Sequence, residues 1–356
     1  MALLEINDLH VSFQTADGIV RAVRGLSFSV DKGQTLGIVG ESGSGKSVST
    51  QTIMGLTRGA RVSGTALFEG RDLLKMSPDE LREVRGLKIG MIFQDPLSSL
   101  HPYYRVGWQI SEMILAHEKR TSKEAARKRS IDLLRLVGIP QPDRRVDDFP
   151  HQFSGGMRQR AMIAMAMALN PTVLIADEPT TALDVTVQAQ VLQVMKRLQS
   201  EFGTAIIMIT HDLGVIAEMA DDVVVMYAGA AMEKAPRREL FFANHHPYTE
   251  GLLESLPAYG GDRERLRPIA GQPPSLINLP TGCPFNPRCP YVMDKCRKEE
   301  PTLLPVGSDP RHLSSCWLPH HPEERARLRA QMADEKVSDA AVVAAAAAAA
   351  AGSQPT

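Results

Sequence analysis

The chain has 356 residues, of which 43% are hydrophobic and 23% charged, and its formal net charge is -1. This length predicts two domains, and a charge so close to zero gives no electrostatic argument for a nucleic-acid partner. No stretch approaches the roughly 18 apolar residues of a membrane span, and the N-terminus MALLEINDLH lacks the pattern of a secretory signal. We therefore expect a cytosolic chain, in which four clustered cysteines indicate metal binding before disulfides.

Strands separated by short turns open the chain. From Leu3 to about Val30, alternating runs such as LEINDLHVSF and GLSFSV are typical of strands, and TADG and DKG are typical of turns. We expect a half-exposed antiparallel sheet in this segment. The run TLGIVG then predicts a buried strand and SVSTQTIMGL a helix, followed by extended segments in GTALFEG and KIGMIFQDP.

A mostly helical region follows, from about residue 106 to residue 169. In SKEAARKRSIDLLRLVGI the apolar residues Ala126, Ile131, Leu134 and Val137 recur at helical spacing, and the basic residues between them predict a solvated face. The Met-rich run MIAMAMAL predicts a buried packing helix rather than an adaptable binding surface.

Buried strands return in TVLIADEP, TAIIMITHD and DDVVVMYAG, each joined to a helical run, which predicts a parallel sheet covered by helices and an α/β core. Around Phe242 the residues Pro, Gly, His and Arg become frequent, so we place a domain boundary there. The predicted domains are residues 1–242, with a helical subdomain at about 98–169, and residues 243–321. The charged and then Ala-rich residues 322–356 predict a disordered tail.

A phosphate-binding loop is predicted between the strand TLGIV and the helix after it. The segment GESGSGKS fits the pattern G-x-x-x-x-G-K-[ST], in which glycines let main-chain N–H groups curl around phosphate oxygens. Lys46 is expected to reach the β and γ phosphates and Ser47 to bind magnesium, while the alternative is an ordinary Gly/Ser turn. The residues of this predicted site are Gly40, Ser42, Gly43, Ser44, Gly45, Lys46 and Ser47.

An acidic pair stands at the end of the strand TVLIADEP. Open α/β sheets bind ligands at the carboxyl ends of their strands, so Asp177 is expected to hold magnesium. Glu178 is expected to accept a proton from the water that attacks the γ phosphate, a task worth about 10²- to 10⁴-fold in rate. The alternative is an acidic pair at the start of a helix.

Between these two motifs, FSGGMRQR resembles the LSGGQ signature of ATP-binding cassette proteins. Phe153 and Met157 depart from the signature, whereas the phosphate-contacting residues of the family are intact at Ser154, Gly155 and Gly156. Other cassette elements appear in family order, namely Phe13 at the adenine-stacking position, Gln94 in FQDP, Asp184 in TTALD and His211 in ITHD.

The resemblance implies a P-loop NTPase nucleotide-binding domain with a RecA-like core, an antiparallel β subdomain and a helical signature subdomain. It implies that Ser154 and the glycines after it cradle the nucleotide of a second cassette, so that two cassettes sandwich ATP. His211 would contact the γ phosphate, and Gln94 would sense magnesium or water and report to a transmembrane subunit. Phe13 would stack on adenine, although an aromatic residue on a strand is often only core or surface filler.

Longer phrases narrow the resemblance to the ATPase subunits of bacterial dipeptide and oligopeptide importers, over roughly residues 3 to 318. These phrases are GESGSGKSVS, FQDPLSSLHP, IADEPTTALDVTVQAQ, MYAG and HHPYT. The resemblance implies a peripheral subunit at the cytoplasmic face of the cell membrane, where ATP hydrolysis powers peptide import. The implied partners are a second ATPase subunit in a heterodimer, two permease subunits and, indirectly, an extracytoplasmic peptide-binding protein.

Alternatives remain at this point. The same machinery can import nickel, glutathione or another small solute, although nickel-type relatives are usually shorter. A soluble cassette ATPase acting on ribosomes or DNA usually holds two cassettes in one chain, whereas SGGM and GKS each occur once here. A structural or regulatory cassette with a dead site is disfavoured by the intact Lys46, Glu178 and His211.

The four cysteines lie in and after GCPFNPRCPYVMDKC, separated by five, six and nineteen residues. Structural zinc usually takes ligand pairs two to four residues apart, and no such pair exists here. A 4Fe–4S cluster accepts wider spacing, and a proline follows two of the thiols as it follows a ligand in some ferredoxins. Importer ATPases with a similar extension are also understood to carry such a cluster. We therefore predict a structural 4Fe–4S cluster, with Zn²⁺ as the alternative, held by Cys283, Cys289, Cys296 and Cys316.

Overall fold

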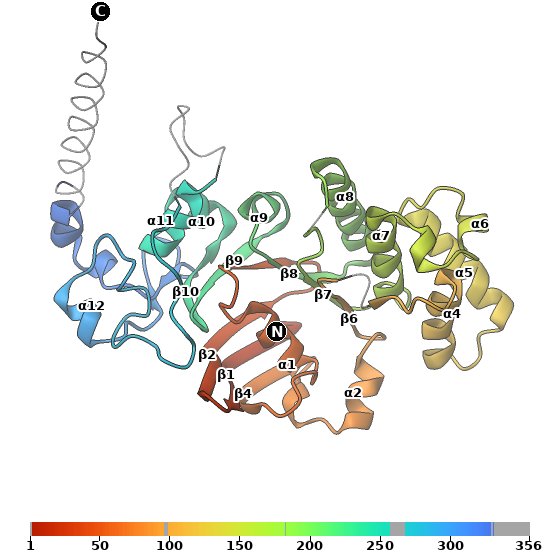
Figure 1. The fold of residues 1–356 in the computed structure, drawn as a ribbon, viewed down its shortest axis with the longest axis horizontal. Coiled ribbons are helices and arrows are strands. Elements are labelled where there is room, and N and C mark those ends of the chain that lie inside the picture. Colours follow the sequence, from red (N-terminus) through yellow and green to blue (C-terminus); the bar gives the residue numbers. More distant parts are fainter. Residues whose placement is uncertain (1, 96–98, 182, 257–267, 329, 331–356) are drawn as a thin grey trace, which may run out of the picture.

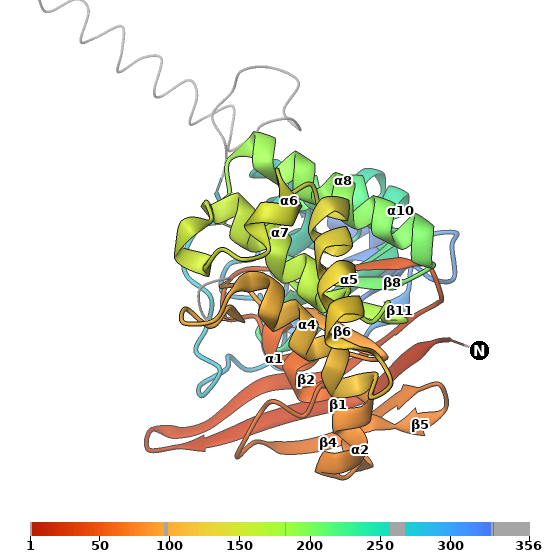
Figure 2. The ribbon, with the colours of Figure 1, turned by 90° about the vertical axis from the view of Figure 1, so that its right-hand side faces the viewer.

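The structure, a computed structural model, describes residues 2–95, 99–181, 183–256, 268–328 and 330 (Figures 1 and 2). Most of the tail predicted to be disordered, residues 322–356, lies outside the described residues. Within it, residues 322–328 are helical.

The N-terminal segments form a four-stranded antiparallel sheet in the order β2-β1-β4-β5. Its first two strands make a hairpin in which Thr15 pairs with Gly18, and a short 3₁₀ helix and α2 follow its last strand. This sheet confirms the antiparallel arrangement that the alternating pattern predicts. The bounds of these elements are β1 Leu4–Thr15, β2 Gly18–Val30, β4 Arg61–Phe68, β5 Arg71–Asp72, η1 Leu73–Lys75 and α2 Pro78–Val84.

A second sheet of eight strands forms the centre of the molecule, in the order β11-β12-β10-β9-β3-β8-β7-β6. The run from β9 to β6 is parallel, and β10 and β12 continue it with antiparallel pairing. The strands are β3 Thr35–Val39, β6 Ile89–Ile92, β7 Val173–Asp177, β8 Ala205–Thr210, β9 Asp222–Tyr227, β10 Ala230–Pro236, β11 Leu304–Pro305 and β12 Leu313–Ser314.

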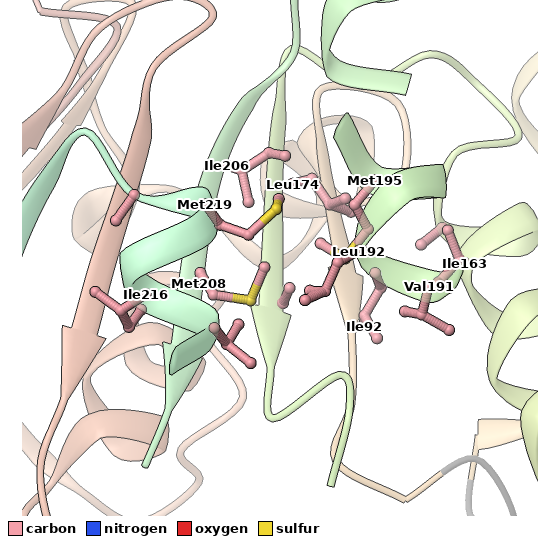
Figure 3. Close-up of a cluster of buried hydrophobic side chains, with 14 of the residues drawn as sticks. Ile92, Ile163, Leu174, Val191, Leu192, Met195, Ile206, Met208, Ile216 and Met219 are labelled. Carbon is pink, nitrogen blue, oxygen red and sulfur yellow. The ribbon is translucent and has the colours of Figure 1, made fainter. Parts of the chain in front are cut away.

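Both faces of the parallel strands are buried, as their continuous apolar runs predict. On β7, Val173 and Ile175 pack into the core shared with the antiparallel sheet, whereas Leu174 packs into the core on the opposite face. Successive side chains of a strand point to opposite faces, so one short strand serves two cores. Figure 3 shows the second core, where Leu174 and Met208 meet side chains of α8 (Val185–Phe202) and α9 (Leu213–Met219).

A helical subdomain lies beyond β6, at one end of the central sheet (Figure 1). Ala126, Leu134 and Val137 are buried there, which confirms the helical spacing of this segment. Met162 is buried as well, as expected for a packing helix. The elements are α4 Val106–His117, α5 Lys123–Leu136, α6 Pro142–Arg145, η2 Pro150–Gln152 and α7 Gly155–Ala166.

The C-terminal extension is continuous with the central sheet. Its strand β12 pairs with β10, with Ser314 opposite Glu233, and His312 Nε2 lies 2.7 Å from Glu233 Oε1 in a fully buried pair. Buried Phe285 also joins the larger core. The remaining elements are α10 Arg237–Phe242, α11 Pro247–Glu254, α12 Asp294–Lys298 and η3 Leu318–His320.

Candidate functional site

The predicted phosphate loop connects the buried strand β3 to α1 (Lys46–Ile53), as the motif requires. Gly45 adopts φ +96° at the helix start, and a Cβ there would lie 2.2 Å from the carbonyl oxygen of Ala22. Gly40 is equally restricted, because its Cβ would lie 2.1 Å from the carbonyl oxygen of Met226. Both positions exclude any side chain, since a left-handed backbone and a close main-chain neighbour coincide there.

Lys46 is buried beneath this loop and donates hydrogen bonds from Nζ to the carbonyl oxygens of Gly40, at 2.8 Å, and Glu41, at 2.9 Å. Burial lowers the pKa of Lys46, and the nearby carboxylates of Glu178, Asp177 and Glu41 oppose that shift. The ammonium group therefore already sits among the atoms of the loop.

Asp177 lies beside the loop at the carboxyl end of β7. Ser47 Oγ donates a 2.8 Å hydrogen bond to Asp177 Oδ1, although 130 residues separate the two. Burial raises the pKa of Asp177; the Ser47 hydrogen bond and Lys46 oppose the shift, and neighbouring Glu178 adds to it. Ser47 and Asp177 meet because β3 and β7 both pair with β8 in parallel, so that the carboxyl ends of β3 and β7 lie at the same edge of the sheet.

Glu178 is the centre of a second group of side chains at this edge. Its Oε2 accepts hydrogen bonds from Gln94 Nε2 at 3.0 Å and Thr181 Oγ1 at 2.9 Å, and its Oε1 lies 3.3 Å from His211 Nδ1. Glu178 itself adopts φ +47°, a left-handed conformation that is uncommon for a non-glycine residue and is often found at functional sites. The structure thus brings the three predicted catalytic residues together.

The signature residues lie elsewhere, at the start of α7 in the helical subdomain. Ser154 caps this helix by accepting a hydrogen bond from the Met157 N–H at 3.3 Å. Gly156 packs against α8, where its Cβ would lie 2.5 Å from Val187 Cγ1, while the Cβ position of Gly155 is open. In the described part of the chain, the hydrogen bonds of Ser154 stay within its own helix.

Asp184 and Phe13 occupy two further positions. Asp184 is exposed and caps α8 through a 2.9 Å hydrogen bond from the N–H of Val187, the residue whose side chain packs against Gly156. Phe13 is half-buried on β1, opposite Val20 on β2, and packs against the apolar core of the antiparallel sheet.

Sequence reasoning missed several residues around the site. Thr181 belongs to TTALD, and its hydroxyl donates a hydrogen bond to the Glu178 carboxylate. Tyr248 accepts the Glu41 N–H at 2.9 Å, and Arg288 grips the Glu41 carboxylate with both terminal nitrogens. Arg288 stands within GCPFNPRCP, between two cysteines, and no local pattern of the sequence indicates its contact with Glu41.

The predicted 4Fe–4S cluster is wrong, and so is its zinc alternative. Across the described ranges, no group of three or more His, Cys, Asp or Glu side chains could hold a metal ion. The four cysteines are instead free thiols that line one apolar cavity with only about 10 Å³ of open space. Burial raises the pKa of Cys283 to about 11 and that of Cys316 to about 12, so both side chains are protonated thiols in this structure.

These thiols instead act as small apolar side chains. Cys283 and Cys296 belong to the larger core, and Cys289 packs against it. The Cys283 N–H also donates to the Cys296 carbonyl oxygen at 2.8 Å, which closes the loop between the two residues without a metal.

The loop that holds Lys46 and the strand end that carries Asp177 and Glu178 together define the class: the protein is an ATPase built on an ATP-binding cassette. The family model described as "ABC transporter" matches residues 23–181, and the one described as "Oligopeptide/dipeptide transporter, C-terminal region" matches residues 232–296. The chain belongs to the family of ATP-binding proteins of oligopeptide and dipeptide ABC transporters.

Curated relatives of the chain are similar over most of their length. The chain is 55% identical over 322 residues to the oligopeptide transport ATP-binding protein OppD of Bacillus subtilis, covering 89% of each chain. It is 50% identical over 335 residues to the dipeptide transport ATP-binding protein DppD of the same organism, covering 93% of this chain and 99% of the relative.

A solved structure supports the fold. The dimeric structure of a post-hydrolysis state of an ATP-binding cassette bound to ADP and Pi matches with a TM-score of 0.61 and 27% identity, covering 66% of this chain and 99% of that one. This match confirms the predicted cassette fold. None of the described helices combines the length and the apolar character needed to cross a membrane.

Proposed function

We propose that the chain hydrolyses MgATP at the site around Lys46 and Glu178 to power the import of di- and oligopeptides across the cytoplasmic membrane. The network that joins Gln94, Glu178 and His211 carries the catalytic part of this proposal. The relatives named for oligopeptide and dipeptide transport support peptides over nickel, glutathione or another small solute. They also disfavour a soluble ATPase that acts on ribosomes or DNA.

The loop fits a triphosphate. Gly43 adopts φ +76° with open space at its Cβ position, so the exposed side of the loop can approach a ligand closely. The buried Lys46 ammonium and the N-terminus of α1 supply positive potential at the same place. We assign the β and γ phosphates to Lys46 and to the main chain of the loop, residues 40–47.

Mg²⁺ fits the oxygen atoms beside the loop. Magnesium favours oxygen ligands, and the Ser47 hydroxyl and the Asp177 carboxylate lie together at the sheet edge, with the amide of Gln94 nearby on Glu178. When bound, this ion neutralises charge on the phosphates. Because burial disfavours the Asp177 carboxylate, a cation at that position relieves an electrostatic cost that the protein otherwise bears.

Glu178 accepts the proton of the attacking water in this proposal. Gln94 and Thr181 hold one carboxylate oxygen, which leaves the orientation of the side chain defined before substrate binds. The side chain of His211 is 59% exposed beside the other oxygen, so it can reach a γ phosphate and orient the water.

A second cassette completes each site. The signature residues Ser154, Gly155 and Gly156 lie on the helical subdomain, and Ser154 and Gly155 are exposed. Such a helix start binds anions, so we assign it to the nucleotide held by the partner cassette. The dimeric cassette bound to ADP and Pi supports this arrangement. We propose a heterodimer in which Phe13 stacks on the adenine of this chain's nucleotide and Asp184 lies at the interface.

The permease subunits are proposed to dock on the apolar cavity between the central sheet and the helical subdomain. This cavity has a volume of about 520 Å³. It is lined by Phe93, the residue before Gln94, and by residues of β6, α4 and α7. A helix from a permease loop could bury apolar side chains in this cavity and contact Phe93, the neighbour of Gln94 in the catalytic network. The apolar lining includes Met54, Met91, Phe93, Met113, Met162 and Met165.

Reconstitution of the complete transporter in vesicles tests the substrate. The chain, its second cassette, both permeases and the extracytoplasmic binding protein are assembled, and uptake of labelled di- and tetrapeptides is compared with uptake of nickel and glutathione. We expect ATP-dependent peptide uptake that Lys46→Ala abolishes. Uptake of nickel or glutathione without peptide uptake would replace the proposed substrate, and peptide uptake unaffected by Lys46→Ala would refute the proposed site.

A further inference from the structure

The C-terminal extension contacts the phosphate loop at Glu41. The Glu41 carboxylate receives a two-pronged ion pair from Arg288, with Nη1 to Oε2 at 2.6 Å and Nη2 to Oε1 at 3.0 Å. Its N–H donates to Tyr248 of α11, and its carbonyl oxygen accepts Lys46 Nζ. One loop residue therefore links the extension to the lysine that we assign to the phosphates.

Arg288 is built into the extension rather than reaching from its surface. Its side chain is only 4% exposed. Nε donates to the Ala270 carbonyl at 2.9 Å, Nη2 also donates to that of Ile269 at 3.3 Å, and Nη1 also donates to the Tyr227 hydroxyl at 3.2 Å. With the two bonds to Glu41, all five N–H donors of the guanidinium have acceptors, which fixes the position of the charge.

The main chain of Arg288 is also held in place. Its N–H donates to the Phe285 carbonyl at 3.0 Å, and the ring of Phe285 packs between Tyr227 and Tyr248 at centroid distances of 5.4 Å and 5.3 Å. Tyr227 ends β9, the strand next to β3. The guanidinium is thus anchored on the same sheet that carries the phosphate loop.

We propose that Arg288 is a positioning residue for nucleotide binding, which neutralises the Glu41 carboxylate and holds it away from the ATP phosphates. Without this partner, a free carboxylate on the phosphate loop would repel the triphosphate and could capture Lys46, whose Nζ already bonds to the Glu41 carbonyl. The inference rests on the proposed nucleotide site. It gives the extension a role in ATP affinity that the predicted metal cluster would not have supplied.

The test measures the affinity of the full-length chain for the fluorescent analogue mant-ATP with Mg²⁺, together with the thermal unfolding of every variant. Arg288→Gln is expected to weaken binding roughly tenfold, the effect of one poorly screened like charge. Adding Glu41→Gln to Arg288→Gln is expected to restore affinity to within about threefold of wild type, because it removes the repelling charge. Glu41→Gln alone is expected to tighten binding.

A matched control uses a second ion pair between the extension and the cassette, in which Arg24 Nη1 lies 3.0 Å from Glu300 Oε1. Glu300→Gln removes that pair and should leave affinity unchanged. If Arg288→Gln does not fold, Arg288→Lys is the second variant, because it keeps the positive charge but cannot make both guanidinium hydrogen bonds to Glu41. Arg288→Lys should weaken binding about two- to fourfold, and adding Glu41→Gln should again restore it.

Three outcomes overturn the inference. These are wild-type affinity in a folded Arg288 variant, no rescue in the double variant, and a tenfold loss in Glu41→Gln alone. Failure of the nucleotide site itself is distinguishable, because wild-type chain would then show no mant-ATP binding that Lys46→Ala removes.

Discussion

Gln94 Nε2 donates a 3.0 Å hydrogen bond to Glu178 Oε2 across 84 residues of sequence. Gln94 follows β6 and Glu178 follows β7, two strands that are neighbours in the parallel sheet. Phe93, the residue before Gln94, lines the proposed permease cavity, so that cavity lies one residue from the contact with the proposed general base. A shift of the helical subdomain that moves Gln94 would change its hydrogen bond to Glu178. Docking of a permease could therefore alter ATP hydrolysis through this one contact.

Glu178→Gln is expected to bind mant-ATP with wild-type affinity and to hydrolyse ATP about 10²- to 10⁴-fold more slowly. The substitution keeps the shape and one oxygen acceptor for Gln94 and Thr181, but the amide cannot accept the proton of water. Steady-state phosphate release by the reconstituted complex provides the measurement. Turnover at the wild-type rate would rule out Glu178 as the base.

Ser154→Arg is expected to abolish coupled ATP turnover in the complex and to leave mant-ATP binding by the isolated chain nearly intact. The arginine would occupy the space assigned to the partner's phosphate, while the loop around Lys46 is untouched. Ser122→Arg is the matched control, because the exposed Ser122 caps α5 as the exposed Ser154 caps α7. Both variants lose a cap worth about 1 kcal/mol, so a difference between them isolates the nucleotide contact. Full ATPase activity of the isolated monomer would contradict the sandwich.

Met165→Glu is expected to lower the ATPase rate of the assembled transporter at least about tenfold, because docking would bury a carboxylate in an apolar interface. Met165 is half-buried and faces the cavity below α7. Phe242→Glu, at an exposed apolar residue on α10, is the control and should have no such effect. Co-purification with the permeases measures docking, and equal recovery of both variants would place the permease contact elsewhere.

His246 is expected to make stability depend on pH. Burial lowers its pKa from 6.5 to about 4, against the opposing effect of Glu233. Below about pH 6.5, His246 binds a proton in the unfolded chain but stays neutral in the folded chain. The free energy of unfolding should therefore fall from pH 6.5 towards pH 4, by on the order of 3 kcal/mol. Above pH 6.5 this contribution is fully present.

The His246→Asn variant isolates this effect. Asparagine can still accept the Tyr248 N–H that His246 Nδ1 accepts at 3.0 Å, but it does not titrate. We expect the difference in urea midpoint between wild type and variant to change across this pH range, whereas His151→Asn, at an exposed histidine, should show no change. A constant difference for His246→Asn would show that the imidazole binds its proton equally well in the folded and the unfolded chain, which would contradict the lowered pKa.

Much of the fold followed from local patterns. The alternating residues of β1 and β2 predicted an antiparallel hairpin, and the continuous apolar runs of β7 and β8 predicted strands covered on both faces. The pattern did not predict that β12 would join this sheet, because a two-residue strand has no period of its own. Its pairing with β10 is accompanied by the buried contact between His312 and Glu233.

The cysteines show the limit of spacing arguments. Their separations along the chain permitted a cluster, but the distances along a loop do not fix what lies between its side chains. In the folded protein the thiols share their cavity with Phe285, Trp317 and Leu318, which leave only about 10 Å³ of open space. Packing of aromatic and aliphatic residues decided the character of this site.

The sequence by itself determined the phosphate loop, the acidic pair and the signature, because each is a strand end or helix start whose geometry depends on residues a few positions away. Only the tertiary structure decided which of these parts meet. Ser47 bonds to Asp177 because their strands flank β8, and Arg288 reaches Glu41 across 247 residues because aromatic packing carries the extension back to β9. Contacts of this kind depend on the packing of the whole chain, and no local pattern encodes them.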